Sequence, residues 1–239
     1  MALNIQTFKT RALTALIFVI VMLAGLFINA WTFIALFTII MIGCIYEFIK
    51  IMRIINGEKY LYYLPLALIY LIMPVLMMID LGITFVTHAA GSGTTVGYFN
   101  TEVLYSPLLP CSIIFSIWIN DTMAYLVGSF IGKTAFSKIS PKKTWEGTIG
   151  GMVLCVIVIA IAGNYIPIAQ VISWKHWMSI AAICAVCGTA GDLLESKLKR
   201  MADIKDSGSF MPGHGGFLDR FDSLLVATPF VWLYIKLIL

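Results

Sequence analysis

Residues 12–49 read ALTALIFVIVMLAGLFINAWTFIALFTIIMIGCIYEFI, two long apolar runs separated near Asn29. A helix needs about 20 mostly apolar residues to cross the roughly 30 Å hydrocarbon core of a bilayer. A cleaved signal peptide would be followed by a small-residue cleavage site and polar sequence, but here a second apolar run follows at once. The stretch therefore predicts two membrane helices, Ala12–Phe27 and Trp31–Ile49, joined by a tight turn.

The composition extends this interpretation to the whole chain. Of the 239 residues, 60% are hydrophobic and only 12% are charged, and the mean hydropathy is +0.95. Soluble domains carry about 25% charged residues. Nucleic-acid binding would need a basic face on a soluble module, which this composition excludes. We expect one all-α, polytopic membrane domain over residues 1–239.

Further apolar runs place the remaining membrane helices. The polar segment Asp80–Glu102 contains no Lys or Arg, whereas the other polar segments are basic, so the positive-inside rule puts this segment outside and the N-terminus in the cytoplasm. Asp121–Phe130 is a candidate for an additional membrane element. About seven to eight spans result, with N-terminal helices in residues 1–102 and a catalytic half in residues 103–239. The later spans are predicted at Leu61–Ile79, Val103–Asn120, Thr148–Ile166, His176–Leu194 and Ser223–Leu239.

Two apparent motifs are not expected to carry chemistry. Cys184 and Cys187 form a CxxC, but they lie inside a predicted membrane helix with no second pair or histidine nearby. The stretch Gly128–Thr134 resembles a P-loop but has one residue too few between its glycines. We therefore favour core packing over metal or redox chemistry for the two cysteines, and we reject a Walker-type ATPase.

Acidic side chains at the end of a span are costly beside hydrocarbon and are functional candidates for that reason. Asp192, Glu195, Ser196 and Lys199 share one face of a helix if the span near residue 192 continues. The same spacing also fits a solvated helix face with ion pairs one turn apart. Taken alone, the pattern leaves both interpretations open.

The glycine-rich segment that follows favours a polyphosphate site. Gly208, Gly213, Gly215 and Gly216 precede a helix, where free backbone N–H groups can bind an anion. Asp219 and Asp222 are three residues apart in the first turn of that helix. Paired aspartates suit a hard divalent cation, and the neighbouring basic residues suit phosphates. Those neighbours are Lys199, Arg200, Lys205 and Arg220; His214 is expected to contact phosphate or to shape the loop.

A third candidate segment is Ser140–Gly147, which precedes a span and contains Lys142, Lys143 and Glu146. Its lysines are candidates for binding a lipid phosphate at the bilayer surface. The alternative is that they only set the topology and extend toward lipid headgroups. Asp121, upstream of this segment, is a further acidic candidate.

At these residues the chain resembles the CDP-diacylglycerol synthase family, also called phosphatidate cytidylyltransferases. The family signature is similar to Ser196-x-Leu198-Lys199-Arg200, then Lys205-Asp206-x-Gly208, then Pro212-x-His214-Gly215-Gly216-x-x-Asp219-Arg220-x-Asp222. Met211 departs conservatively from the family pattern. The segments around Asp121 and Ser140–Gly147 also look like family motifs, so the resemblance covers the C-terminal half.

The resemblance implies transfer of CMP from CTP to phosphatidate, which gives CDP-diacylglycerol and pyrophosphate. It implies dependence on Mg²⁺, with room for a second cation, and it implies that Asp192 and Asp219 bind metal. Membrane lipids are expected partners, and a homodimer is an assembly that the resemblance allows. The expected location is a bacterial inner membrane, with the active site facing the cytoplasm.

The candidate residues fall into three overlapping sets. The catalytic set is Asp192, Lys199, Arg200, Lys205, Asp206, His214, Asp219, Arg220 and Asp222. The substrate-binding set is Asp121, Lys142, Lys143, Glu146, Ser196, Gly215 and Gly216. The metal set is Asp192, Glu195, Asp219 and Asp222.

Two other functions stay open at this stage. A related CTP-dependent membrane enzyme, such as a polyprenol kinase or a synthase for ether-linked archaeal lipids, would use similar residues on another lipid. A transporter would show charge spread through both halves or paired broken helices. The polar residues here concentrate on one side of the C-terminal half, which favours an enzyme.

Overall fold

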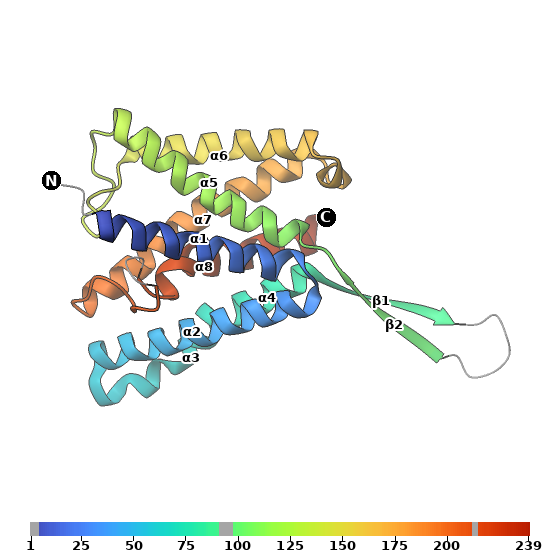
Figure 1. Cartoon of the computed structure of the whole chain (residues 1–239), viewed down its shortest axis with the longest axis horizontal. Helices are drawn as coiled ribbons and strands as arrows, with labels where there is room; N and C mark the ends of the chain where they lie inside the picture. Colours follow the sequence, from blue (N-terminus) through green and yellow to red (C-terminus); the bar gives the residue numbers. More distant parts are fainter. Residues whose placement is uncertain (1–4, 91–97, 212–214) are drawn as a thin grey trace.

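The computed structural model describes residues 5–90, 98–211 and 215–239, which form a bundle of long helices (Figure 1). Short irregular helical segments lie at Gly57–Tyr63 (η1), Leu68–Ile72 (η2) and Pro167–Val171 (η3). The strands are β1 (Ile83–Ala90) and β2 (Tyr98–Tyr105). The α-helices are α1 (Ile5–Phe27), α2 (Ala30–Asn56), α3 (Leu64–Ala67), α4 (Met73–Gly82), α5 (Leu108–Ile131), α6 (Trp145–Tyr165), α7 (Trp174–Met201) and α8 (Leu218–Ile238).

The predicted tight turn near Asn29 is confirmed by a capping box. Asn29 Oδ1 accepts a hydrogen bond from the Thr32 N–H at 2.9 Å, and Thr32 Oγ1 accepts one from the Asn29 N–H at 3.1 Å. This reciprocal pair satisfies two N–H groups at the start of α2. It lets α2 begin immediately after α1 ends.

The stretch Ala30–Gly82 is helical over 53 residues and is one of five stretches long and apolar enough to span a membrane. A straight helix of that length would measure about 80 Å, far more than a bilayer. Gly57, whose φ is +54°, ends α2, and the chain then returns through α3 and α4 beside α2 (Figure 1). Together with the shorter apolar stretch Ala12–Phe27, the described residues make seven helical passes, which confirms the predicted all-α membrane bundle.

Helix α5 corrects two predicted boundaries. The fourth span was expected at Val103–Asn120, with Asp121–Phe130 as a candidate eighth element. The helix instead begins at Leu108 and runs unbroken to Ile131. Gly132, which follows it, has an extended backbone conformation. Asp121 therefore lies within a membrane helix and not in a loop.

The outer segment Asp80–Glu102 is also different from the expected polar loop. Residues 83–90 pair with residues 98–105 as an antiparallel hairpin, in a register that places Ile83 opposite Tyr105. β-Branched and aromatic residues, which favour strands, occur in the sequences of both strands. The hairpin projects from the bundle (Figure 1) and adds two strands to an otherwise helical protein.

The loops that carry the candidate residues share one end of the bundle. The connections α2–α3, α5–α6 and α7–α8 lie at the end where α1 begins, and the hairpin and the C-terminus lie at the other (Figure 1). At that far end Asp80 of α4 pairs with Lys236 at 2.8 Å and accepts a hydrogen bond from Trp232 Nε1 at 2.7 Å. The end of α8 is thereby joined to α4.

The bundle interior and its outer surface are both largely apolar. Phe33, Phe37, Leu71 and Ile180 are fully buried in the core. Many large apolar side chains are exposed on the outside, including Ile39, Leu66, Val153 and Phe230. A surface of this kind suits lipid as the solvent and not water.

Candidate active site

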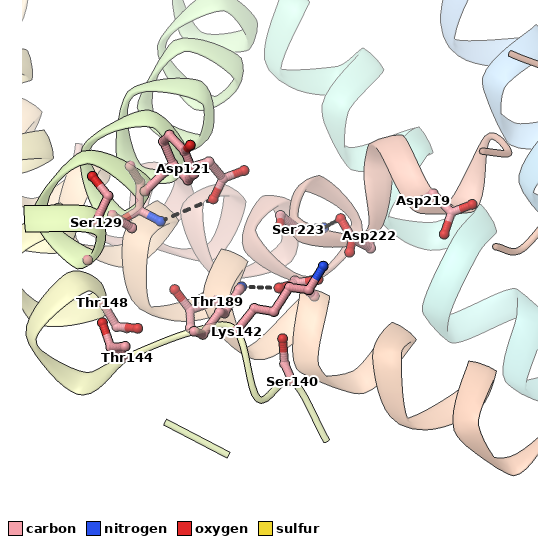
Figure 2. A pocket seen from close by; sticks show the side chains of 16 residues that line it. Asp121, Ser129, Ser140, Lys142, Thr144, Thr148, Thr189, Asp219, Asp222 and Ser223 are labelled. Carbon is pink, nitrogen blue, oxygen red and sulfur yellow. Dashed lines mark hydrogen bonds and ion pairs between the residues drawn. The ribbon is translucent and has the colours of Figure 1, made fainter. Parts of the chain in front are cut away.

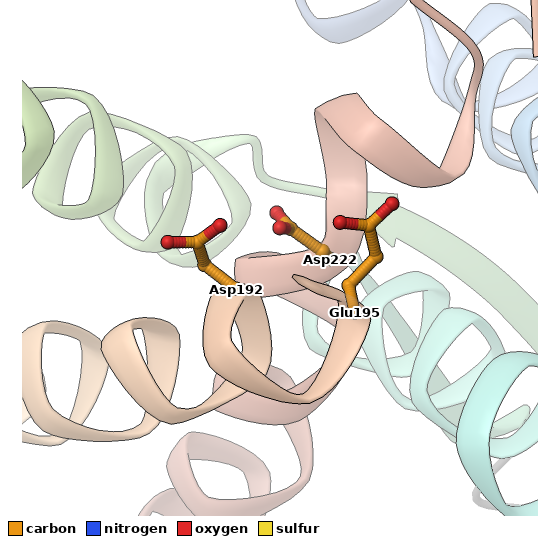
Figure 3. A group of neighbouring side chains, drawn as sticks. All are labelled: Asp192, Glu195 and Asp222. Atoms are coloured by element: carbon orange, nitrogen blue, oxygen red, sulfur yellow. The ribbon is translucent and has the colours of Figure 1, made fainter. Parts of the chain in front are cut away.

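Three carboxylates meet between α7 and α8. Asp192 and Glu195 lie one turn apart on α7, and Asp222 faces them from α8 (Figure 3). One oxygen of each lies within 4.8 Å of the others. Glu195 is fully buried and Asp222 is 8% exposed. Buried carboxylates this close need cations or hydrogen bonds between them.

The close approach of α7 and α8 depends on Gly191. A Cβ at this position would lie 2.5 Å from the carbonyl oxygen of Asp222 and 3.1 Å from the Cα of Ser223. At Gly188, one turn earlier, the nearest atom to a Cβ would be 3.4 Å away, an ordinary contact. The missing side chain at Gly191 thus brings Asp222 to the α7 carboxylates.

Gly191→Ala is therefore expected to lower the free energy of unfolding by about 1–3 kcal/mol, the usual cost of overpacking. The matched control Gly188→Ala should be neutral or stabilising by up to about 1 kcal/mol, since alanine favours a helix over glycine. Thermal unfolding of the two variants in detergent provides the measurement. Equal unfolding midpoints for both variants would contradict the close-contact explanation.

Lys199 connects two of the acidic side chains. Its ammonium nitrogen lies 2.6 Å from Glu195 Oε2 and 2.6 Å from Asp219 Oδ1. The other oxygen of Asp219 accepts hydrogen bonds from the N–H groups of Ser207 and Gly216, both at 2.8 Å, and the Ser207 hydroxyl oxygen lies 2.9 Å from it. Asp219 is thus fully engaged by the protein and lies outside the three-carboxylate cluster.

The buried cluster keeps spare acceptor capacity. Among the described residues, Glu195 Oε1 has no hydrogen-bond partner, and Glu195 Oε2 has only the ammonium of Lys199 at 2.6 Å. Among the described residues, Asp222 accepts a single hydrogen bond, from the Ser223 N–H at 2.6 Å. Oxygen donors with free lone pairs are what a hard divalent cation requires. The residues present therefore fit a metal ion.

The loop between α5 and α6 brings a cation to the cluster. Lys143 forms an ion pair with Asp192. The backbone holds this loop through hydrogen bonds from Phe136 N–H to the Lys143 carbonyl at 2.8 Å and from Trp145 N–H to the Thr134 carbonyl at 3.0 Å. Thr144 then caps α6 by accepting a hydrogen bond from the Gly147 N–H. The loop is fixed on both sides of Lys143.

A cavity of about 480 Å³ lies between this loop and the carboxylates (Figure 2). Asp121 lines it from α5 and Asp222 from α8, and Asp219 of α8 lies farther to one side (Figure 2). Its wall thus combines acidic, basic and hydroxyl groups. The lining residues are Asn120, Asp121, Ala124, Tyr125, Gly128, Ser129, Ser140, Lys142, Lys143, Thr144, Thr148, Thr189, Asp192, Asp219, Asp222 and Ser223.

The structure brings together part of the predicted residue sets. Asp121, Lys142, Lys143, Asp192, Asp219 and Asp222 line the cavity, and Glu195 and Lys199 lie beside it. Ser196, Arg200, Lys205 and Asp206 do not line it, and the last three are exposed. Arg220 borders a separate apolar groove, and His214 lies outside the described residues.

Two further predicted residues have local structural contacts. Glu146, expected to bind substrate, accepts hydrogen bonds from the N–H groups of Lys133 and Thr134 and from the Thr134 hydroxyl at 2.9 Å. Gly215 has a φ of +87°, a conformation that favours glycine. Both residues shape loops at the cavity end of the bundle.

The expected anion site in the glycine-rich segment is filled by the protein itself. The Gly216 N–H donates to Asp219, and the N–H groups of Phe217 and Leu218 donate to Glu47 of α2, each at 2.9 Å. The described N–H groups at the start of α8 therefore bind the protein's own carboxylates and not an external phosphate. The rest of the predicted anion site includes residues 212–214, which lie outside the described residues, so an anion site there stays a prediction.

Glu47 was missed by sequence reasoning although a signal was present. It is a charged residue inside an apolar stretch long enough to span a membrane, and such residues are functional candidates. Asn120, Thr148 and Thr189 were also missed, since single polar residues on a helix have no distinctive spacing.

The C-terminal part of the chain is similar to known proteins. The family model described as "Cytidylyltransferase family" matches residues 99–238. The chain is 44% identical over 123 residues to the phosphatidate cytidylyltransferase of Bacillus subtilis, an alignment covering 51% of this chain and 45% of that protein. The Thermotoga maritima phosphatidate cytidylyltransferase is 38% identical over 130 residues, covering 53% and 48% respectively.

A plant relative, the chloroplastic phosphatidate cytidylyltransferase 4 of Arabidopsis thaliana, is 38% identical over 142 residues, which are 59% of this chain and 34% of that protein. The chain thus spans about half the length of the two bacterial relatives it matches. The matched residues 99–238 include every residue that lines the cavity. Because this match extends over more than half of its residues, the chain belongs to the cytidylyltransferase family.

Proposed function

We propose that this protein transfers CMP from CTP to phosphatidate, forming CDP-diacylglycerol and pyrophosphate. The observation that carries the proposal is the 480 Å³ cavity whose lining combines several carboxylates with Lys142 and Lys143. That combination suits a nucleotide whose phosphates need both a cation and basic side chains. The names of the relatives support the same substrates.

Asp192, Glu195 and Asp222 are the residues we propose to hold Mg²⁺, with Asp219 at the edge of the cavity. Bound there, Mg²⁺ supplies positive charge that neutralises the phosphates of the nucleotide. Asp121 lines the same cavity from α5 and gives it oxygen donors beyond this cluster. We include a second cation in the proposal for this reason.

The proposed reaction needs positioning and charge neutralisation more than proton transfer. A phosphate oxygen of phosphatidate, already an anion at neutral pH, attacks the α-phosphorus of CTP. A new P–O bond forms as the bond from the α-phosphorus to the bridging oxygen breaks, and pyrophosphate leaves with that electron pair. No general base is required, so held geometry and compensating charge carry the catalysis.

The basic residues divide by their positions. Lys142 and Lys143 line the cavity and are proposed to neutralise substrate phosphates. Lys199 holds Glu195 and Asp219 in place. Arg200 and Lys205 are exposed near the same end of the bundle. There we propose that their positive charges attract CTP as it approaches and pyrophosphate as it leaves.

An apolar groove of about 330 Å³ is the proposed place for the acyl chains. Ile17 and Phe18 of α1, Ile39 of α2 and Phe217 contribute to its wall, and Arg220 borders it. Lipid tails gain by contact with such a wall, and a guanidinium at its border suits a lipid phosphate.

We propose that the cavity end faces the cytoplasm of a bacterial inner membrane. The basic loops gather at that end of the bundle, which agrees with the positive-inside rule. The homodimer allowed by the resemblance stays a prediction, which the mass of the protein in detergent would test.

Pyrophosphate release by purified protein tests the function directly. With phosphatidate and Mg²⁺ present, we expect release with CTP or dCTP and little with ATP, GTP or UTP. Omitting phosphatidate, or replacing it with diacylglycerol, is expected to abolish the signal. Release with CTP only when a polyprenol or an ether-linked lipid is the acceptor would replace phosphatidate in the proposal.

A further inference from the structure

Glu47 connects the N-terminal helices to the catalytic half. It lies on α2, is 4% exposed, and accepts three hydrogen bonds from residues about 160 to 171 positions later in the chain. Its Oε2 accepts from the Ser207 hydroxyl at 2.7 Å and from the Leu218 N–H at 2.9 Å, and its Oε1 accepts from the Phe217 N–H at 2.9 Å. Both oxygens are therefore used.

The surroundings of Glu47 are shaped to receive its carboxylate. Cβ atoms at Gly208 or Gly216 would collide with it. No Lys, Arg or His pairs with Glu47 in residues 5–90, 98–211 and 215–239. Its charge is instead compensated by N–H groups at the positive end of α8. This contact is specific for a carboxylate.

Ser207 carries the contact on to Asp219. Its hydroxyl lies 2.7 Å from Glu47 Oε2 and 2.9 Å from Asp219 Oδ2, and its own N–H donates to the same Asp219 oxygen. Glu47 and Asp219 thus share Ser207 and the first residues of α8. Any shift of Glu47 moves the groups that hold Asp219, and Asp219 lines the cavity.

We propose that Glu47 is a positioning residue: by binding Ser207 and the start of α8, it fixes Asp219 at the edge of the cavity. The residue lies outside the segment 99–238 that the family model matches. Its role in turnover rests on the proposed function, whereas its role in holding Asp219 does not.

Hydrogen exchange of the purified protein in detergent tests the positioning. In Glu47→Gln, one acceptor oxygen becomes an NH₂ donor that faces N–H or O–H donors. Because hydrogen bonds to charged groups are among the stronger ones, we expect exchange about tenfold or more faster at the amides of Phe217 and Leu218. The decisive amides are Ser207 and Gly216, which contact Asp219 and not Glu47 through their N–H groups. Hydrogen exchange at these two amides should also become faster in Glu47→Gln.

The controls separate this effect from general damage. Glu58→Gln removes an exposed carboxylate just after α2, and Cys44→Ala removes a buried side chain one turn from Glu47. Neither is expected to change exchange at Ser207 or Gly216. If Glu47→Gln does not fold, Ser207→Ala interrupts the same connection while leaving the Phe217 and Leu218 contacts, and it should accelerate exchange at Gly216. Unchanged exchange at Gly216 in the folded variant tested would overturn the proposal.

Turnover supplies an independent measurement. Asp219 shares Lys199 with Glu195, a proposed metal ligand, and outer groups that orient metal ligands typically contribute 10- to 100-fold to metal affinity or activity. For Glu47→Gln we expect the Mg²⁺ concentration at half-maximal rate to rise by about 10- to 100-fold, and Glu47→Asp to recover part of this loss. If the wild-type protein releases no pyrophosphate under any condition, the proposed function fails, and the exchange experiment still decides the positioning role.

Discussion

Asp222→Asn is expected to reduce pyrophosphate release from CTP and phosphatidate by about 100-fold or more. A bound cation contributes several kcal/mol of charge stabilisation, and each 1.4 kcal/mol corresponds to about a tenfold change in rate. Asp222 is buried between α7 and α8 and belongs to the three-carboxylate cluster. Removing its charge should therefore weaken the proposed metal site without changing the shape of the side chain.

The fold should survive this substitution. The oxygen of an asparagine can still accept the hydrogen bond that the Ser223 N–H donates to Asp222. Asp203→Asn is the matched control, because Asp203 is exposed and has a φ of +53°, which asparagine tolerates. Rates are compared over a range of Mg²⁺ concentrations. A folded Asp222→Asn protein with wild-type rates and Mg²⁺ dependence would remove this carboxylate from the proposed site.

Lys199→Met is expected to destabilise the protein by about 3–5 kcal/mol, the usual cost of removing one partner of a buried ion pair. The Lys199 side chain is 14% exposed, and its two partners, Glu195 and Asp219, are 1% and 6% exposed. Both carboxylates would be left buried without their cation. A large fall in the thermal unfolding midpoint in detergent is the predicted observation.

Neutralising the partners should separate stability from activity. In the triple variant Lys199→Met, Glu195→Gln, Asp219→Asn, neither former partner of Lys199 keeps a charge, so much of the lost stability should return while pyrophosphate release stays low. Lys197→Met, at an exposed position on the same helix, is expected to leave the free energy of unfolding within about 0.5 kcal/mol of the wild-type value. A Lys199→Met protein as stable as this control would show that the ion pairs contribute little.

The membrane fold was predictable from sequence because apolar run length is a direct consequence of bilayer thickness. Residues 12–49 predicted α1, the turn at Asn29 and most of α2. The extension of α5 past Asn120 was not predictable in this way. Asp121 interrupts the apolar pattern, but its polarity is accommodated by the cavity and not by a loop, so polarity alone gave the wrong boundary.

In the site, too, neighbours on one helix were predictable from sequence, whereas contacts between distant parts of the chain were not. Helical spacing predicted that Asp192 and Glu195 would share a face, and Asp222 joins them as a metal candidate. Spacing also suggested that Asp219 would point the same way as Asp222, but Lys199 and Ser207 hold it apart from the cluster. Contacts of this kind, like that between Glu47 and Leu218, join residues distant in the chain and have no sequence period.

Helix α8 is fastened at both of its ends by acidic side chains from the first 82 residues, Glu47 at its start and Asp80 near its close. A fragment trimmed to residues 99–238, the part that the family model matches, would lack both anchors. We therefore expect the smallest unit that folds on its own to be larger than the segment by which the family is recognised.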